Sequence, residues 1–292
     1  MSTAALGLGC VTFGREIAAP AARAMLEHAY ARGLRHLDTA AVYGSGESER
    51  IVGAWLAERR PADVTVATKM IPPYGAPAIR AGVAAGLLRL GLPKVDIFYL
   101  HRDDPGLDDD TLRALDTEVR AGRIDRLGIT NIQQERLAHL LARQTALGLA
   151  RFRVLQCNQN LAVTELDDAM RAVCVAHDLE VVTFSPLGAG FLTGKHRSGV
   201  AAGSRFALVP GHQSIYFNPD SRARLEALLV LAAETELEPA RLALAWALGR
   251  SGVSTVLVGG RTPAAIEQAL AARAALDPAI VTRLEAIAHL KA

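Results

Sequence analysis

Apolar positions along this chain follow two different periods. Short apolar runs, rich in Val, Ile and Leu and with little polar alternation, are separated by longer stretches in which apolar residues recur every three or four positions. Short runs without alternation are typical of parallel strands that are covered on both faces. They predict eight strands, at residues 6–11, 33–38, 64–69, 95–101, 124–130, 154–158, 179–184 and 255–259.

The longer stretches predict helices between these strands. In residues 20–32 apolar side chains recur at helical spacing, Pro20 stands at the start and Gly33 follows the end. The same spacing predicts further helices at 47–58, 77–90, 109–121, 132–144, 166–177, 239–249 and 263–272. No linker rich in Pro, Gly or Ser interrupts the alternation, so we expect one (β/α)8 barrel domain over residues 1–292.

One connection is longer than the others. The strand that ends at Phe184 and the helix that begins at Pro239 are separated by an inserted segment, in which we expect an added helix near 221–235. In a barrel this insertion follows the carboxyl end of strand 7, the face on which active sites are built. Residues 278–290 predict one more helix, outside the barrel. The early glycines lack the GxGxxG spacing ahead of a helix, which disfavours a doubly wound dinucleotide-binding sheet.

Charge and cysteine content exclude several function classes. Lys and Arg number 32 against 30 Asp and Glu, a formal net charge of +2, which gives no basic surface for nucleic acid or anionic membrane. The chain has neither a basic, apolar leader nor an apolar run of the ~20 residues that a spanning helix needs. Its three cysteines form no CxxC and its histidines lack metal-ligand spacing, so we expect a cytoplasmic protein without a metal site.

Polar side chains stand where the predicted strands end, and a barrel brings such positions to one rim. The rim positions are Asp38, Tyr43 in the following loop, Lys69, His101, Thr130, Asn131, Gln156, Phe184 and Ser185. Several have a structural alternative: Asp38 and Asn131 as helix caps, His101 as a satisfied structural histidine and Phe184 as core. Lys69 is harder to explain in that way, because a lysine that ends a buried strand must find a partner or lose its charge.

Four of these residues form a set that is able to donate a proton to an oxygen. A free tyrosine has a pKa of about 10, and we expect the Lys69 ammonium to lower the pKa of Tyr43 by about one unit or more. Asp38 would keep Lys69 charged, and His101 would donate a hydrogen bond to a carbonyl oxygen. No Ser–His or Cys–His nucleophile is evident, so the attacking group is expected to be a hydride from a cofactor.

The sequence resembles the aldo-keto reductase superfamily over nearly its whole length. The matching motifs are LDTAAVYGSGESERIVG (37–53), VATKM (66–70), YLHRDDP (99–105), LGITN (127–131), VLQCN (154–158), VVTFSPLGAGFLTGK (181–195), GSRF (203–206) and LVGGRTPAAIEQ (257–268). The resemblance implies a (β/α)8 barrel, NADPH in preference to NADH, and a small-molecule carbonyl substrate. It also implies a catalytic tetrad of Asp38, Tyr43, Lys69 and His101 with Tyr43 as general acid.

The resemblance further implies a set of cofactor contacts. Thr130, Asn131 and Gln156 would hold the nicotinamide carboxamide, and Phe184 would stack on the nicotinamide ring. Ser185, Leu187 and Gly188 would lie along the pyrophosphate. Gly259, Arg261, Thr262 and Gln268 would hold the 2′-phosphate and adenine. Many relatives have an acidic residue and an Asn late in this last helix, where this chain has Gln268 and Ala269.

Two other functions stay open at this point. The chain is also compatible with a non-catalytic or weakly catalytic NADPH-binding subunit, and with a Schiff-base aldolase that uses Lys69 as nucleophile. Asp38 as a partner of Lys69 favours the charged amine, which counts against the aldolase. For the substrate pocket, we expect lining residues among Trp55, Tyr74 and the segment 206–217.

Overall fold

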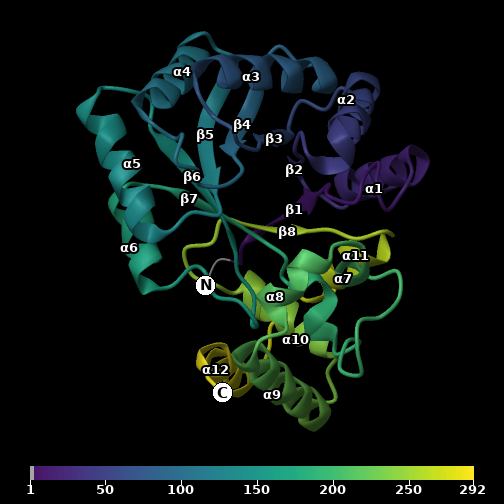
Figure 1. Ribbon diagram of the computed structural model, residues 1–292. Coiled ribbons are helices and arrows are strands. Elements are labelled where there is room, and N and C mark those ends of the chain that lie inside the picture. Colours follow the sequence, from purple (N-terminus) through teal and green to yellow (C-terminus); the bar gives the residue numbers. More distant parts are fainter. Residues whose placement is uncertain (1–2) are drawn as a thin grey trace.

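Eight parallel strands close into a barrel in chain order, each paired with its neighbours in sequence and β8 paired with β1 (Figure 1). The computed structural model describes residues 3–292. The strands are β1 (Ala5–Gly9), β2 (His36–Asp38), β3 (Thr65–Met70), β4 (Val95–Leu100), β5 (Ile124–Thr130), β6 (Phe152–Asn158), β7 (Glu180–Phe184) and β8 (Thr255–Val258). The predicted (β/α)8 barrel is confirmed.

An outer ring of helices covers the barrel, one after each strand. These are α1 (Ala19–Ala31), α2 (Glu47–Arg59), α3 (Ala76–Leu90), α4 (Asp109–Arg120), α5 (Gln134–Ala146), α6 (Asp168–Ala176), α10 (Pro239–Leu248) and α11 (Ala264–Ala271). Local signals place several of these helix starts: Pro20 lies in the first turn of α1, and Asp108 caps α4 by accepting a hydrogen bond from the Thr111 amide at 2.9 Å.

The structural alternative for Asn131, a cap on α5, is not what the structure shows. The helix begins at Gln134, with Gln133 in the capping position and no side-chain cap. Asn131 has a positive φ of 53° and turns its amide back toward the ends of β4 and β5. Asn tolerates the left-handed region better than most residues, because its short polar side chain finds local partners.

The inserted segment after β7 contains the expected long helix, α9 (Pro219–Thr235), and the chain ends with α12 (Pro278–His289), which lies beside α9 (Figure 1). The insertion also contains two helical turns that the apolar period did not predict, α7 (Arg205–Leu208) and α8 (Gln213–Tyr216). Helices of four residues are too short to show a 3.6-residue period. Within residues 3–292, no helix is long and apolar enough to cross a membrane.

Apolar side chains fill the inside of the barrel below its polar rim. The interior cluster is Ala67, Ile97, Tyr99, Val154, Val182 and Leu257. The ring of Tyr99 lies against Gly128 of the neighbouring strand, where a Cβ would come within 2.3 Å of the ring. Side chains alternate along each strand, so the next inward-facing positions toward the carboxyl end, beyond this apolar cluster, are Lys69, Thr130 and Gln156. The fold therefore raises these polar groups to the carboxyl end of the barrel.

A second apolar cluster anchors the inserted segment. Its members come from the loop after β6, the insertion with α9, and helices α10 and α12, and include Phe191, Phe206, Tyr216, Leu228 and Trp246. Tyr216 also exchanges hydrogen bonds with the amide of Asn158, at 3.1 and 3.2 Å, and so joins α8 to the end of β6. The insertion is thereby held at the carboxyl end of the barrel.

Candidate active site

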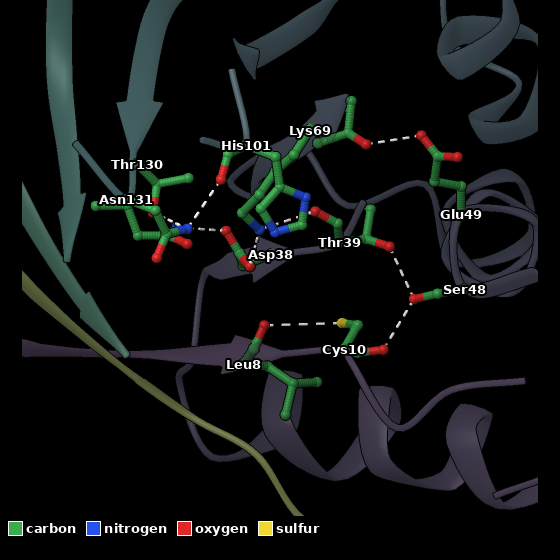
Figure 2. Close-up of polar contacts among 12 residues, drawn as sticks. Leu8, Cys10, Asp38, Thr39, Ser48, Glu49, Lys69, His101, Thr130 and Asn131 are labelled. Atoms are coloured by element: carbon green, nitrogen blue, oxygen red, sulfur yellow. Dashed lines mark hydrogen bonds and ion pairs between the residues drawn. The ribbon is translucent and has the colours of Figure 1, made fainter. Parts of the chain in front are cut away.

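A buried ion pair lies at the centre of the polar rim. Asp38 ends β2 and Lys69 stands near the end of the adjacent β3, where the Lys69 ammonium donates hydrogen bonds to Asp38 Oδ1 and, at 3.0 Å, to the Thr39 carbonyl (Figure 2). From the far side of the barrel, Gln156 Nε2 donates to Asp38 Oδ2 at 2.8 Å. Lys69 is 1% exposed. Two buried charges are therefore paired and further hydrogen-bonded, as a stable buried pair requires.

The pair keeps Lys69 charged. Burial disfavours the ammonium, but the Asp38 carboxylate and the nearby Tyr43 outweigh this effect, so the pKa of Lys69 is raised above its ordinary value. A lysine that attacks a carbonyl must first lose its proton. This environment does the opposite, and it favours an electrostatic role for Lys69 over a nucleophilic one.

Tyr43 lies beside this ammonium, at the start of a 3-10 turn (Tyr43–Gly46) after β2. Lys69 Nζ is 5.2 Å from the centroid of the Tyr43 ring. The expectation that Tyr43 has a lowered pKa is wrong: burial raises the pKa of its phenol above the ordinary value, and Lys69 only opposes that rise. The phenol is therefore protonated at neutral pH, which is the form that a proton donor needs.

His101 follows β4 directly and packs edge-on against Tyr43, with the ring centroids 5.8 Å apart. Burial, and then the Lys69 charge, lower the pKa of His101 to about 3. The imidazole is consequently neutral at physiological pH. Its Nδ1 is buried and has no hydrogen-bond partner within residues 3–292. A neutral imidazole of this kind is suited to hydrogen bonding with a bound molecule rather than to carrying charge.

Thr130 and Asn131 lie beside His101 at the end of β5. Asn131 Nδ2 donates to the His101 carbonyl at 2.8 Å and to Thr130 Oγ1 at 3.2 Å. Thr130 is buried and pairs in register with Gln156, while Asn131 is exposed. The structure therefore brings Thr130, Asn131 and Gln156 to the same rim as the ion pair.

The chain turns sharply after β7, where Phe184 is followed by a run of unusual backbone conformations. Ser185 has a positive φ of 56°, Leu187 has φ −100° and ψ 11°, and Gly188 is left-handed with φ 57°. Within this turn the Gly188 amide donates to the Ser185 carbonyl at 2.8 Å, and the Gly190 amide donates to the Leu187 carbonyl at 3.0 Å. Lys195 Nζ lies 2.8 Å from where a Cβ on Gly190 would stand, which adds a positive charge to this turn.

The remaining predicted positions lie at the start of α11. Arg261 and Thr262 precede the helix and Gln268 lies within it, and all three are exposed. Arg261 donates a hydrogen bond to the Gly203 carbonyl at 3.1 Å, so this loop contacts the inserted segment. A Cβ built on Gly259 would lie 3.0 Å from the Gly9 carbonyl oxygen. The structure places these residues on another loop of the same barrel end, after β8.

Two of the residues expected to line the pocket lie elsewhere. Trp55 is 1% exposed, donates to Glu27 at 2.8 Å and packs edge-on against Tyr30, so it belongs to the contact between α1 and α2. Phe206 is fully buried in the cluster beneath the insertion. Large aromatic side chains are more often packed in cores than presented to a ligand. Tyr74 does lie near the rim, since its hydroxyl donates to the Arg102 carbonyl at 2.8 Å.

Comparison with known proteins identifies the family. A family model described as "Aldo/keto reductase family" matches residues 5–289. The chain belongs to the aldo/keto reductase family. It is accordingly an NAD(P)H-dependent oxidoreductase with the barrel described above.

Relatives of this aldo/keto reductase carry several kinds of name. It is 28% identical to the uncharacterized oxidoreductase YrpG of Bacillus subtilis, over 97% of this chain and 91% of that protein. It is 27% identical to a probable aldo-keto reductase of Glycine max, over 88% and 77% of the two chains. It is also 28% identical to a probable voltage-gated potassium channel subunit beta of Oryza sativa subsp. japonica, over 96% and 91%.

The sequence did not single out the groups that surround the ion pair in this aldo/keto reductase. Thr39, Ser48 and the Cys10 carbonyl form a buried chain of hydrogen bonds next to Lys69 (Figure 2). Thr39 and Ser48 both fall inside the motif at 37–53. Their polar character within a buried stretch was the available signal, but the sequence does not show which partners they meet.

A surface groove of about 520 Å³ lies at the opposite end of the barrel, where β5 and β6 begin. Arg126, Arg151 and Arg153 line it, together with the loop before β6. None of the predicted site residues contributes to this groove. The candidate active site is therefore identified by the chemistry gathered at the carboxyl end.

Proposed function

We propose that this aldo/keto reductase reduces the carbonyl group of a small aldehyde or ketone with NADPH, and that Tyr43 donates the proton. The observation that carries the proposal is the buried Lys69–Asp38 pair, whose ammonium lies 5.2 Å from the centroid of the Tyr43 ring. NADPH, when bound, supplies the hydride that goes to the carbonyl carbon. The protein must then supply a proton and stabilise the negative charge that develops on the oxygen.

Each member of the tetrad has a distinct task. Tyr43 is protonated at neutral pH, because burial raises its pKa. As its proton moves to the substrate oxygen, the fixed charge of Lys69 stabilises the phenolate that is left. Asp38 holds that ammonium charged and in place. His101, neutral at physiological pH, donates a hydrogen bond that orients the carbonyl oxygen.

The cofactor roles follow from where polar groups face the same end of the barrel. The buried Nδ1 of His101 has no partner in the described part of the chain, and Lys195 Nζ brings a positive charge to the turn after Ser185. Both features fit a bound dinucleotide. We assign binding of the nicotinamide carboxamide to Thr130, Asn131 and Gln156, and stacking on the nicotinamide ring to Phe184. Ser185, Leu187 and Gly188 are assigned to the pyrophosphate.

The adenosine end decides between NADPH and NADH. Arg261 and Thr262 stand before the first turn of α11, with Gly259 before them and Gln268 further along the helix. An arginine at this point offers paired N–H donors to a 2′-phosphate, which only NADPH carries. We therefore assign NADPH as the preferred cofactor, with Gln268 beside the adenine.

A panel of aldehydes and ketones, assayed with NADPH and with NADH side by side, tests substrate class and cofactor together. We expect oxidation of NADPH by at least one carbonyl, and Tyr43→Phe to lose at least about 100-fold in kcat while it still binds NADPH, measured by quenching of protein fluorescence. Tyr30→Phe is the matched control, since that hydroxyl bonds the exposed Asp63 far from the rim. A Tyr43→Phe variant that keeps most of its rate refutes the assignment of the acid.

A second candidate function rests on the similarity to the rice protein named as a potassium channel subunit beta. In this alternative the chain binds NADPH tightly and serves as a partner subunit with little turnover. Tight retention of the cofactor together with negligible turnover over the whole panel favours this alternative.

We also place the protein in the cytoplasm, because Cys10, Cys157 and Cys174 are all buried and unpaired.

A further inference from the structure

The ion pair is one link in a closed ring of hydrogen bonds, whose links through Thr39, Ser48 and the Cys10 carbonyl are drawn in Figure 2. Lys69 Nζ donates to the Thr39 carbonyl at 3.0 Å, and Thr39 Oγ1 donates to Ser48 Oγ at 2.7 Å. Ser48 Oγ in turn donates to the Cys10 carbonyl at 2.9 Å, and the Cys10 amide donates to the Asp38 carbonyl at 2.8 Å. Asp38 closes the ring through its carboxylate, which accepts from Lys69.

Ser48 is the member that joins separate segments. It is the second residue of α2, whereas Thr39 follows β2 and Cys10 follows β1. Ser48 and Thr39 are both 0% exposed, so water does not replace either partner. A buried hydroxyl that loses its partner costs more than the bond itself contributes, because the remaining group stays desolvated. Ser48 thus adds a side-chain anchor to Thr39, whose amide also donates to the Ala67 carbonyl at 2.9 Å.

The orientation of the Thr39 peptide matters for Lys69. The ammonium has three N–H donors, and the structure gives two of them to Asp38 and the Thr39 carbonyl. If the Thr39 carbonyl moves away, the ammonium loses a fixed acceptor and its direction relative to Tyr43. Displacements of about 1 Å at such a point are enough to lower catalytic rates strongly.

We propose that Ser48 is a positioning residue for the reductase reaction: by holding Thr39 against Cys10, it directs the Lys69 ammonium toward Tyr43. The inference rests on the proposed function of Tyr43 and Lys69. Ser48 itself touches neither substrate nor cofactor in this scheme. It acts through the Thr39 carbonyl alone.

Three substitutions and one control test the inference. Ser48→Ala removes the link, Thr39→Val removes the donor but keeps the shape, and Thr39→Ser keeps the donor. The control is Ser221→Ala, a serine that is 1% exposed and donates to the Ala162 carbonyl at 3.0 Å, in the cluster below the insertion. It removes the same kind of buried hydrogen bond far from Lys69.

The kinetic readout is kcat, KM and the pH dependence of kcat. We expect Ser48→Ala and Thr39→Val to lower kcat about 10-fold with KM changed less than about two-fold. They should also move the alkaline fall in kcat to higher pH by about half a unit or more, because the Lys69 charge that lowers the pKa of Tyr43 would no longer be directed at the phenol. Thr39→Ser and Ser221→Ala should match the parent protein. The inference is wrong if Ser48→Ala and Thr39→Val both keep the parent kcat and pH profile, or if Ser221→Ala shows the same loss.

A second readout needs neither cofactor nor turnover. The chain has four lysines, at 69, 94, 195 and 291, and the last three are exposed. Spectra of protein labelled with ¹⁵N-lysine should therefore show one protected ammonium signal, that of Lys69. We expect Ser48→Ala and Thr39→Val to shift it and to speed its hydrogen exchange about three-fold or more, and an unchanged signal contradicts the inference. If the parent protein reduces no carbonyl, the proposed function fails while this signal still decides the role of Ser48.

Discussion

Replacing Lys69 by methionine removes the charge that Asp38 faces and keeps most of the side-chain volume. The side chains of Lys69 and Asp38 are 0% and 4% exposed, so the carboxylate would stay buried without its ion-pair partner. Breaking a buried pair from one side costs about 3–5 kcal/mol. Gln156 still donates to Asp38 Oδ2 at 2.8 Å, which places the expected loss of unfolding free energy at the lower end, about 3 kcal/mol.

The measurement is urea unfolding at pH 7, followed by circular dichroism. Adding Asp38→Asn to Lys69→Met removes the stranded charge, so the double variant should recover about 2 kcal/mol relative to Lys69→Met alone. The control is Lys94→Met, an exposed lysine directly before β4, which should change stability by less than about 0.5 kcal/mol. A loss below about 1 kcal/mol for Lys69→Met, or no recovery in the double variant, refutes the reasoning that the two charges depend on each other.

Two further predictions concern the neighbours of this pair. The pKa of His101 is about 3 in the folded protein and 6.5 in the unfolded chain, so between these pH values the unfolded state binds more protons and stability falls as the pH drops. At pH 5 the parent should have lost about 2 kcal/mol of unfolding free energy that the His101→Gln variant does not lose. Equal losses for the two proteins in urea titrations would contradict this prediction. Gly128→Ala places a Cβ 2.3 Å from the Tyr99 ring and should cost about 1–3 kcal/mol of unfolding free energy. The control Gly211→Ala has open space around it and should be neutral. Equal urea midpoints for the two variants would overturn this packing argument.

The barrel was predictable because its determinants are local. Strands buried on both faces and helices with one apolar face each show their own period, and eight alternations in one chain leave few architectures. The same logic gathered Asp38, Lys69 and His101, since the carboxyl ends of parallel strands meet at one rim. The short helices α7 and α8 were not predicted, because four-residue turns are too short to show a period. They are held instead by the packing of residues such as Phe206 and Tyr216 under the insertion.

The electrostatics of the site were not predictable to the same degree. The sequence indicates that Lys69 is near Tyr43, and a neighbouring ammonium alone lowers the pKa of a phenol. The structure adds that Tyr43 is half-buried among its neighbours, and this desolvation raises that pKa by more than Lys69 lowers it. Burial depends on what every surrounding segment covers, so no local pattern reports it.

Contacts between distant segments were likewise invisible in the sequence. Arg205 of α7 pairs with Glu16 in the loop after β1 at 3.0 Å, and Arg261 reaches the Gly203 carbonyl. These partners are 189 and 58 residues apart. Both join the insertion to loops at the carboxyl end of the barrel, which is where the proposed dinucleotide assignments lie. The insertion is therefore part of the site architecture rather than an appendage.

The geometry around position 69 also explains why that residue is a lysine in a chain that otherwise favours arginine. An ammonium is compact and directs three N–H groups to separate points, whereas a guanidinium presents a planar fork. Two of the Lys69 donors are taken by Asp38 and the Thr39 carbonyl. The third is left, and the centroid of the Tyr43 ring lies 5.2 Å from the nitrogen. A planar arginine fits two oxygens of one carboxylate well but cannot meet a carboxylate, a carbonyl and a phenol that surround a single buried atom.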